Sequence, residues 1–236
     1  MHLQGTHVVV IGGSTGIGLA AATLARQEGA EITIAGRSPE KLAAAQRTLG
    51  EARTIAADIT DEASVAQVFE GLSRVDHVVI SAGTIISGKL VDNDLANLRR
   101  ILDERLWGLT YVVRQAVPRM RQGSITFTSG SLSSRPRPGT AMLTAALAGV
   151  EALTPALALE VAPIRVNTVT PGLVDTPLLH AAYGAERDSI VQNRAAVLPG
   201  KRVGTPADIA QVMLMLMRNE YITGEVLHVD GGGRFV

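Results

Sequence analysis

Residues 7–18 read His-Val-Val-Val-Ile-Gly-Gly-Ser-Thr-Gly-Ile-Gly, so an apolar, β-branched run breaks there into a glycine loop. The run at 8–11 predicts a strand buried on both faces, and the Ala-rich residues 19–25 predict the helix that it feeds. The junction glycines that suit a phosphate-binding turn are Gly12, Gly16 and Gly18. Glycine there permits a tight turn, a close approach of backbone N–H groups to a pyrophosphate, and close packing of the helix on the sheet. An ordinary strand-to-helix turn is the alternative.

The chain has 236 residues, which suits one α/β domain, and we expect a single domain over residues 1–236. Apolar residues make up 46% of the sequence and aromatic residues only 3%, so the core is expected to consist of Ala, Val, Leu and Ile. Lys plus Arg equal Asp plus Glu at 22 each. Without a net charge, neither nucleic acid nor an anionic membrane is an expected partner.

Cysteine is absent, which excludes disulfides, thiolate catalysis and cysteine-bound zinc, and no metal site is predicted. The N-terminus lacks the apolar core of a signal peptide, and no uninterrupted apolar segment reaches the length of a membrane span. We therefore expect a cytoplasmic protein.

Strand and helix patterns alternate along the rest of the chain. Strands are expected near residues 31–35, 54–57, 78–80, 124–128, 164–169 and 225–230, and helices near 38–49, 61–72, 94–120, 140–159 and from 205. The segment 171–199 has weaker periodicity and three prolines, which is typical of a lid over a site, placed at about 174–200. The alternation predicts a Rossmann-type α/β fold, a doubly wound parallel sheet of about seven strands with helices on both faces.

A glycine, proline or polar residue follows six of the predicted strands. These residues are Gly12, Arg37, Asp58, Ser81, Ser129 and Pro171. Ligands of such sheets bind at the carboxyl ends of the strands, so these residues are expected to meet at one rim.

Four segments resemble the short-chain dehydrogenase/reductase family, in the same order and over the whole chain. The glycine loop is similar to the family's Thr-Gly-x-x-x-Gly-x-Gly, with Ile11 in place of Thr, and Ser81-Ala82-Gly83 is similar to its Asn-Ala-Gly. Residues 164–176 are close to its Arg-Val-Asn-x-x-x-Pro-Gly-x-x-x-Thr, and residues 223–232 resemble its closing segment.

The resemblance implies a bound nicotinamide dinucleotide. The implied contacts lie in the glycine loop, after the third and fourth strands and beside the nicotinamide: Gly12, Ser14, Thr15, Gly16, Ile17, Gly18; Asp58, Ile59, Ser81, Ala82, Gly83; Pro171, Gly172 and Thr176. A structural turn is the alternative for each.

The end of the second predicted strand bears on the choice between NAD and NADP. An acidic residue there would bind the ribose hydroxyls of NAD and repel the 2′-phosphate of NADP. The sequence instead has Arg37, whose guanidinium can pair with that phosphate, and Ser38, whose hydroxyl can donate to it. We predict NADP(H) in preference to NAD(H), with a solvated loop arginine as the alternative.

The family usually carries an Asn, Ser, Tyr and Lys tetrad, in which Tyr is the general acid/base, and this chain lacks it. Alignment of residues 150–160 with the family's helix puts these residues at the four positions: Arg105, Gly130, Leu143 and Leu147. Residues 112–182 contain no Tyr and residues 90–200 contain no Lys, so no shift of the alignment restores the pair.

Two functions of different class remain open. The first is an NADP(H)-dependent oxidoreductase of a small carbonyl, alcohol or enone substrate with a non-standard proton donor. The candidate donors are Ser129, Ser131, His180 and Tyr183. The second is a catalytically silent NADP(H)-binding sensor, scaffold or partner subunit, in which Leu143 and Leu147 simply make the pocket apolar. A titratable group in the pocket near the nicotinamide separates the two.

The predicted helices at 94–120 and 140–159 are apolar beyond one stripe. In the family the corresponding helices pair across a dimer face, so a homodimer or homotetramer is expected. Burial of both helices within one subunit is the alternative.

Overall fold

The strand before the glycine loop, β1 (His7–Ile11), lies inside a parallel sheet in the computed structural model, which describes residues 3–236. Val8 and Val10 join the apolar core on one face of the sheet, and Val9 and Ile11 join the core on the other. Successive side chains of a strand point to opposite faces, so a strand covered on both sides needs apolar residues throughout. The prediction of a doubly buried strand is confirmed.

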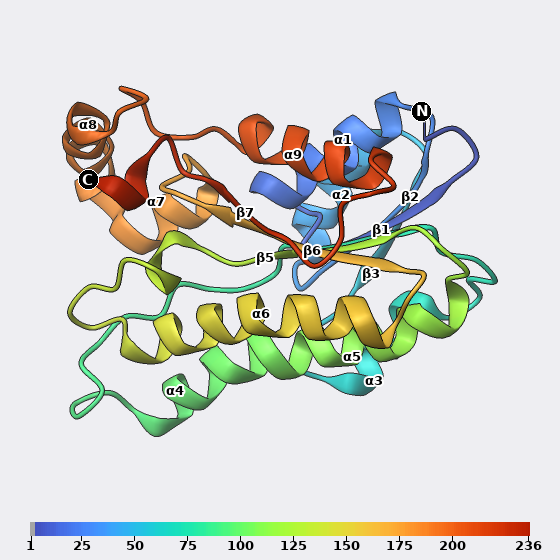
Figure 1. Cartoon of the computed structure of the whole chain (residues 1–236), viewed down its shortest axis with the longest axis horizontal. Helices are drawn as coiled ribbons and strands as arrows, with labels where there is room; N and C mark the ends of the chain where they lie inside the picture. Colours follow the sequence, from blue (N-terminus) through green and yellow to red (C-terminus); the bar gives the residue numbers. More distant parts are fainter. Residues whose placement is uncertain (1–2) are drawn as a thin grey trace.

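The sheet has seven parallel strands in the order β3-β2-β1-β4-β5-β6-β7 (Figure 1). The others are β2 (Glu31–Gly36), β3 (Ala52–Ala56), β4 (His77–Ile80), β5 (Ser124–Thr128), β6 (Arg165–Pro171) and β7 (Val226–Val229). The order reverses between β1 and β4, which creates a crevice at the carboxyl ends of these two strands. The predicted Rossmann-type fold is confirmed.

Helices cover both faces of the sheet (Figure 1). One face carries α1 (Gly16–Gln27), α2 (Pro39–Leu49) and α9 (Pro206–Arg218), and the other carries α3 (Glu62–Phe69), α4 (Leu95–Leu102), α5 (Gly108–Ala116) and α6 (Ala141–Glu160). Two further helices, α7 (Pro177–Tyr183) and α8 (Arg187–Val197), occupy the predicted lid segment.

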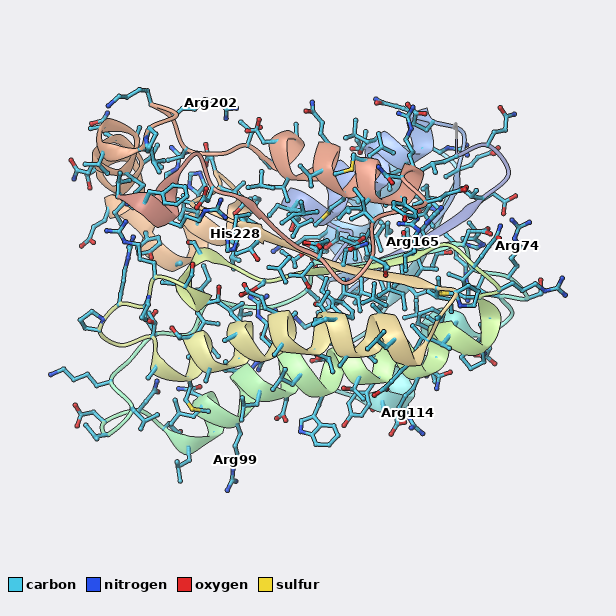
Figure 2. All side chains as sticks on the ribbon, viewed as in Figure 1. Arg74, Arg99, Arg114, Arg165, Arg202 and His228 are labelled. Carbon is cyan, nitrogen blue, oxygen red and sulfur yellow. The ribbon has the colours of Figure 1, made fainter. Side chains whose placement is uncertain are left out.

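Side chains make hydrogen bonds to the backbone groups at both ends of α9. Thr205 and Asp208 form a reciprocal cap, with Asp208 Oδ2 2.7 Å from the Thr205 backbone nitrogen. Arg165 of β6 points into the interior (Figure 2) and donates to the carbonyl oxygens of Leu216 at 2.7 Å and Met217 at 3.0 Å. Because the last carbonyls of a helix have no partner within it, this arginine fixes the end of α9 on the sheet.

The single helix predicted at 94–120 is wrong in detail. A π-helical turn, η1 (Asp103–Trp107), separates α4 from α5, and a 3-10 turn, η2 (Val117–Arg119), ends the run at Pro118. A π turn leaves the apolar periodicity of its flanks almost intact, so the sequence pattern does not reveal it. The third strand begins earlier than predicted, because its pairing with β2 starts at Ala52.

The 20-residue helix α6 is long and apolar enough to cross a membrane, with a hydropathy of 1.6. Glu151 and two threonines interrupt this helix, so it does not contradict the expectation about uninterrupted apolar segments. Ala146, Val150 and Thr154 are buried, and Thr154 Oγ1 lies 2.6 Å from Thr168 Oγ1 of β6. The helix is thus a packed part of the domain.

Candidate functional site

A cavity of ≈ 580 Å³ opens where the strand order reverses. All but one of the predicted cofactor contacts line it: Gly12, Ser14, Thr15, Gly16, Ile17, Arg37, Ser38, Asp58, Ile59, Ser81, Ala82, Gly83, Pro171, Gly172 and Thr176. The exception, Gly18, lies outside the lining. The structure therefore brings together residues from both halves of the sheet, as the parallel topology requires.

Backbone atoms pack so closely around the glycine loop that two of its positions have no room for a side chain. A Cβ atom on Gly12, which has φ +86°, would lie 2.6 Å from the Ala82 nitrogen, and one on Gly18 would lie 2.2 Å from the Gly12 oxygen. Gly18 thus serves the packing of α1 against the loop, a role expected of a junction glycine, and its cofactor contact stays a prediction. At Gly16 a Cβ would meet only the Thr176 side chain at 3.4 Å, although φ is +55°.

The first turn of α1 fits a phosphate. Thr15 precedes the helix and its side chain makes no capping hydrogen bond. Thr15, Gly16 and Ile17 line the cavity, so the N-terminal turn of α1 faces it. N–H groups at a helix N-terminus, together with the helix dipole, favour an anion at this point.

Arg37 stands at the end of β2 as predicted. Its side chain is 51% exposed, and its Nη1 lies 3.8 Å from Glu104 Oε1. Ser38 caps α2, with its Oγ accepting a hydrogen bond from the Lys41 nitrogen at 3.2 Å, and Lys41 also lines the cavity. Two cations, Arg37 and Lys41, therefore border the pocket beyond the end of β2.

Asp58 is held by its own turn. Its Oδ1 accepts hydrogen bonds from the Thr60 nitrogen at 3.0 Å and from Thr60 Oγ1 at 2.9 Å. Burial raises the pKa of Asp58, but the bonds from Thr60 and the attraction of Arg37 and Arg100 outweigh it and leave the pKa below its usual value. The carboxylate is therefore ionised at the cavity wall.

The π turn η1 contributes Glu104, a buried carboxylate that sequence reasoning missed. Its Oε2 accepts from the Thr84 nitrogen at 2.7 Å and from Thr84 Oγ1 at 2.6 Å, and its Oε1 accepts from Arg100 Nε at 3.0 Å. Burial raises the pKa of Glu104, but these hydrogen bonds reverse the effect and lower it. Glu104 thus links the loop after β4 to Arg37.

The next residue of the turn, Arg105, lies against the backbone of Gly83. A Cβ on Gly83 would be 2.4 Å from Arg105 Cζ, so the glycine makes room for the guanidinium. Arg105 Nη2 donates to the Thr84 oxygen at 3.4 Å, and Nε is buried without a partner among residues 3–236. Burial lowers the pKa of Arg105, with Glu104 opposing the shift.

The candidate proton donors separate by geometry. Ser129, Ser131 and Tyr183 line the cavity, whereas His180 does not. Ser129 is buried, and its Oγ lies 2.7 Å from Glu151 Oε1, an oxygen that also accepts from Ser133 Oγ at 2.7 Å. Ser129 is therefore tied to the helix behind it, while Ser131 and Tyr183 remain open to the cavity.

The predicted lid segment forms the two helices α7 and α8, and α7 borders the cavity. Leu178, Leu179 and Tyr183 of α7 line the cavity. Arg187, the first residue of α8, pairs with Asp175, which precedes α7, and lies 2.5 Å from Asp188. The pairing with Asp175 therefore links the start of α8 to the segment before α7.

Comparison with known proteins assigns this architecture to a family. A family model described as enoyl-(acyl carrier protein) reductase matches residues 12–233. The short-chain dehydrogenase/reductase malC of Malbranchea aurantiaca is 30% identical over 250 residues, covering 98% of this chain and 95% of the relative. This chain belongs to the short-chain dehydrogenase/reductase family.

Other members of the short-chain dehydrogenase/reductase family are equally similar over their full length. The NADP-dependent (R)-specific alcohol dehydrogenase of Lentilactobacillus kefiri is 30% identical, covering 98% of this chain and 97% of the relative. The solved MalC reductase/Diels-Alderase structure has a TM-score of 0.93 at 30% identity and covers 99% of this chain and 98% of its own. A small-chain dehydrogenase solved with NADPH has a TM-score of 0.86 at 35% identity, and the match covers 98% of this chain and 99% of that one.

In this short-chain dehydrogenase/reductase the expected Tyr and Lys positions form an apolar wall. Leu143 and Leu147 line the cavity, are 2% and 3% exposed, and belong to an apolar cluster with Leu98 and Ile101 of α4. A Cβ on Gly130, the residue at the Ser position, would lie 3.5 Å from Leu147 Cδ1. Of the four tetrad positions, only Arg105 places a polar side chain at the cavity.

Proposed function

We propose that this chain is an NADP(H)-dependent oxidoreductase of a small carbonyl, alcohol or enone substrate that works without the Tyr–Lys pair. The observation that carries the proposal is one continuous cavity, which runs from the glycine loop and Arg37 to the apolar wall of Leu143 and Leu147. The cofactor, when bound, supplies or accepts the hydride. The chain must orient the substrate, exclude water and stabilise charge on its oxygen.

NADP(H) is favoured over NAD(H) by charge. Arg37 and Lys41 border the cavity beyond β2, with no acidic residue at the end of that strand to repel a 2′-phosphate. The NADPH-bound neighbour and the NADP-dependent relative support the same choice.

Charge that develops on the substrate oxygen needs a donor or a cation. Leu143 and Leu147 exclude water but donate nothing. Arg105 brings a positive charge to the cavity wall. Of the candidate donors, Ser131 and Tyr183 have the hydroxyl groups that remain for proton transfer. Of these, Tyr183 lies on the lid.

The test is NADPH oxidation, followed by absorbance, over a panel of aldehydes, ketones and enones. We expect turnover of at least one substrate, a loss of about 10²-fold or more in kcat for Tyr183→Phe, and no loss for the off-cavity variant His180→Gln. Turnover that survives in Tyr183→Phe would assign the proton to Ser131 or to water.

The leucine wall favours a second candidate, a catalytically silent NADP(H)-binding sensor, scaffold or partner subunit. MalC, whose name combines a reductase with a Diels-Alderase, is a relative credited with more than reduction. NADPH binding without oxidation over the whole panel would support this candidate and contradict the first.

We also propose a homo-oligomer in the cytoplasm. Trp107 of η1 is 56% exposed and Leu159 of α6 is 83% exposed, and such apolar side chains fit a helix face of a second copy. Size-exclusion chromatography at micromolar concentration tests assembly, and a monomer there would contradict it.

A further inference from the structure

Three arginines gather at the lid side of the cavity. Arg135 and Arg137 belong to the loop between β5 and α6, and Arg194 belongs to α8. Figure 1 shows this loop, α8 and the C-terminal residues at the same end of the molecule. Arg137 and Arg194 line the cavity together with Leu132, Leu143 and Leu147, so charge and apolar surface share one space.

The C-terminal turn holds two of the guanidinium groups side by side. Arg135 Nη1 donates to the Gly233 oxygen at 3.0 Å, and Arg194 Nη2 donates to the same oxygen at 2.9 Å. A Cβ on Gly233 would lie 2.8 Å from Arg194 Nη2, so the glycine permits this approach. The loop carrying Arg137 is closed by Thr140 Oγ1, which donates to the Arg137 oxygen at 2.7 Å.

No ion pair neutralises the positive charge of this group in the part of the chain that the structure describes. The ion pairs found among residues 3–236 include none of Arg135, Arg137 and Arg194. Asp230 is the acidic residue that acts on Arg194, but its two oxygens accept hydrogen bonds from the backbone nitrogens of Gly232 and Arg234. Burial lowers the pKa of Arg194, and repulsion from Arg137 and Arg135 lowers it further.

We infer that Arg137 and Arg194 bind the anionic head group of the substrate, a carboxylate or phosphate, while its apolar body lies against Leu132, Leu143 and Leu147. Arg137 comes from the loop after β5 and Arg194 from α8, and both line the cavity close enough for their charges to repel each other. Two guanidinium groups of this kind suit a planar or tetrahedral oxyanion. Arg135 supports the site from outside by fixing the turn that positions Arg194. The inference rests on the proposed function for the place of the substrate beside the cofactor.

Matched probes of equal chain length test the head group. Octanoate, octyl phosphate and octan-1-ol are titrated by calorimetry into protein saturated with NADPH. We expect one or both anions to bind roughly tenfold or more tightly than the alcohol, since charge-assisted hydrogen bonds replace a neutral one. The anion that binds more tightly identifies the source of the oxyanion.

The double variant Arg137→Gln/Arg194→Gln should lose that preference and keep its affinity for octan-1-ol, which shows that the apolar wall is intact. Arg99→Gln is the control, because Arg99 points away from α4 into solvent (Figure 2) and should change nothing. Equal affinity for all three probes, or a preference that survives in the double variant, would overturn the inference.

The same titrations without NADPH separate this inference from the proposed function. If NADPH itself does not bind, the proposed function fails, and the probes then report on the arginines alone. If NADPH binds and the anions gain nothing over the alcohol, the inference fails and the proposed function stands.

Discussion

The two halves of the cavity differ in what builds them. The cofactor half, from β1 to α2, depends on backbone geometry: a Cβ would clash at Gly12 and Gly18, and Arg37 and Lys41 add positive charge at its edge. The substrate half depends on side chains of α6 and of the predicted lid, and Leu143 and Leu147 stand there at the positions where the sequence comparison predicts the family's Tyr and Lys. Because the two halves lie on different elements, one can change its chemistry while the other keeps its fit to the nucleotide.

The π turn η1 lies between the halves and contacts both. Glu104 receives hydrogen bonds from Thr84 and approaches Arg37 in the cofactor half. Arg105 lies on Gly83 and lines the cavity, and its Nε has no partner among residues 3–236. A change in one half can therefore be tested for effects on the other.

The largest effect is expected from rebuilding the substrate half. In the triple variant Gly130→Ser/Leu143→Tyr/Leu147→Lys, carbonyl reduction should rise by about 10²–10⁴-fold, the contribution of a positioned general acid. Gly130 has an extended backbone, and its added side chain would begin at ordinary contact distance from Leu147. The measurement is kcat on the panel of carbonyl compounds.

Leu143→Phe/Leu147→Met is the matched control, since it changes shape without adding a titratable group. Equal rates in the two variants would show that the halves differ in more than these three side chains.

The next largest effect is expected in the cofactor half and tests its dependence on backbone geometry. Gly18→Ala should lower the affinity for NADPH by about 10²-fold or more, because the new Cβ would lie 2.2 Å from the Gly12 oxygen and must displace the loop. Gly130→Ala in the other half should leave NADPH affinity unchanged. Fluorescence titration measures both, with circular dichroism as the check of folding. Similar losses in the two variants would contradict the comparison.

Arg37→Ala is expected to have a smaller and selective effect. It should lower the affinity for NADPH by about 10–100-fold, the effect of a lost charge-assisted contact, and leave the affinity for NADH unchanged within about twofold. Arg47→Ala, on the exposed side of α2, is the control. Equal losses for NADPH and NADH would refute the phosphate role.

The same difference between the two halves of the cavity explains how much of the fold and of the site could be predicted from the sequence. The sheet and the glycine loop are encoded locally, in apolar runs along the chain and in positions where only glycine fits, so the strand pattern and residues 7–18 were sufficient to predict them. Glu104 and Arg194 reach the cavity through a π turn and a lid helix that pack by tertiary contacts. Neither residue has a local sequence signal. The positive charge of the Arg- and Pro-rich loop at 129–139 is visible in the sequence, but the residues that this loop contacts are not.

The smallest effect concerns Ser129, the candidate donor whose hydroxyl bonds to Glu151 Oε1. Ser133 donates to the same oxygen at the same distance of 2.7 Å but does not line the cavity, which makes it the matched control. Ser129→Ala and Ser133→Ala should each lower the free energy of unfolding by about 1–2 kcal/mol, the cost of one lost hydrogen bond, and neither should change NADPH oxidation. Denaturant unfolding and kcat give the two readings. If only Ser129→Ala abolished turnover while both lost the same stability, Ser129 would be a catalytic residue, and the substrate half would retain one member of the family's chemistry after all.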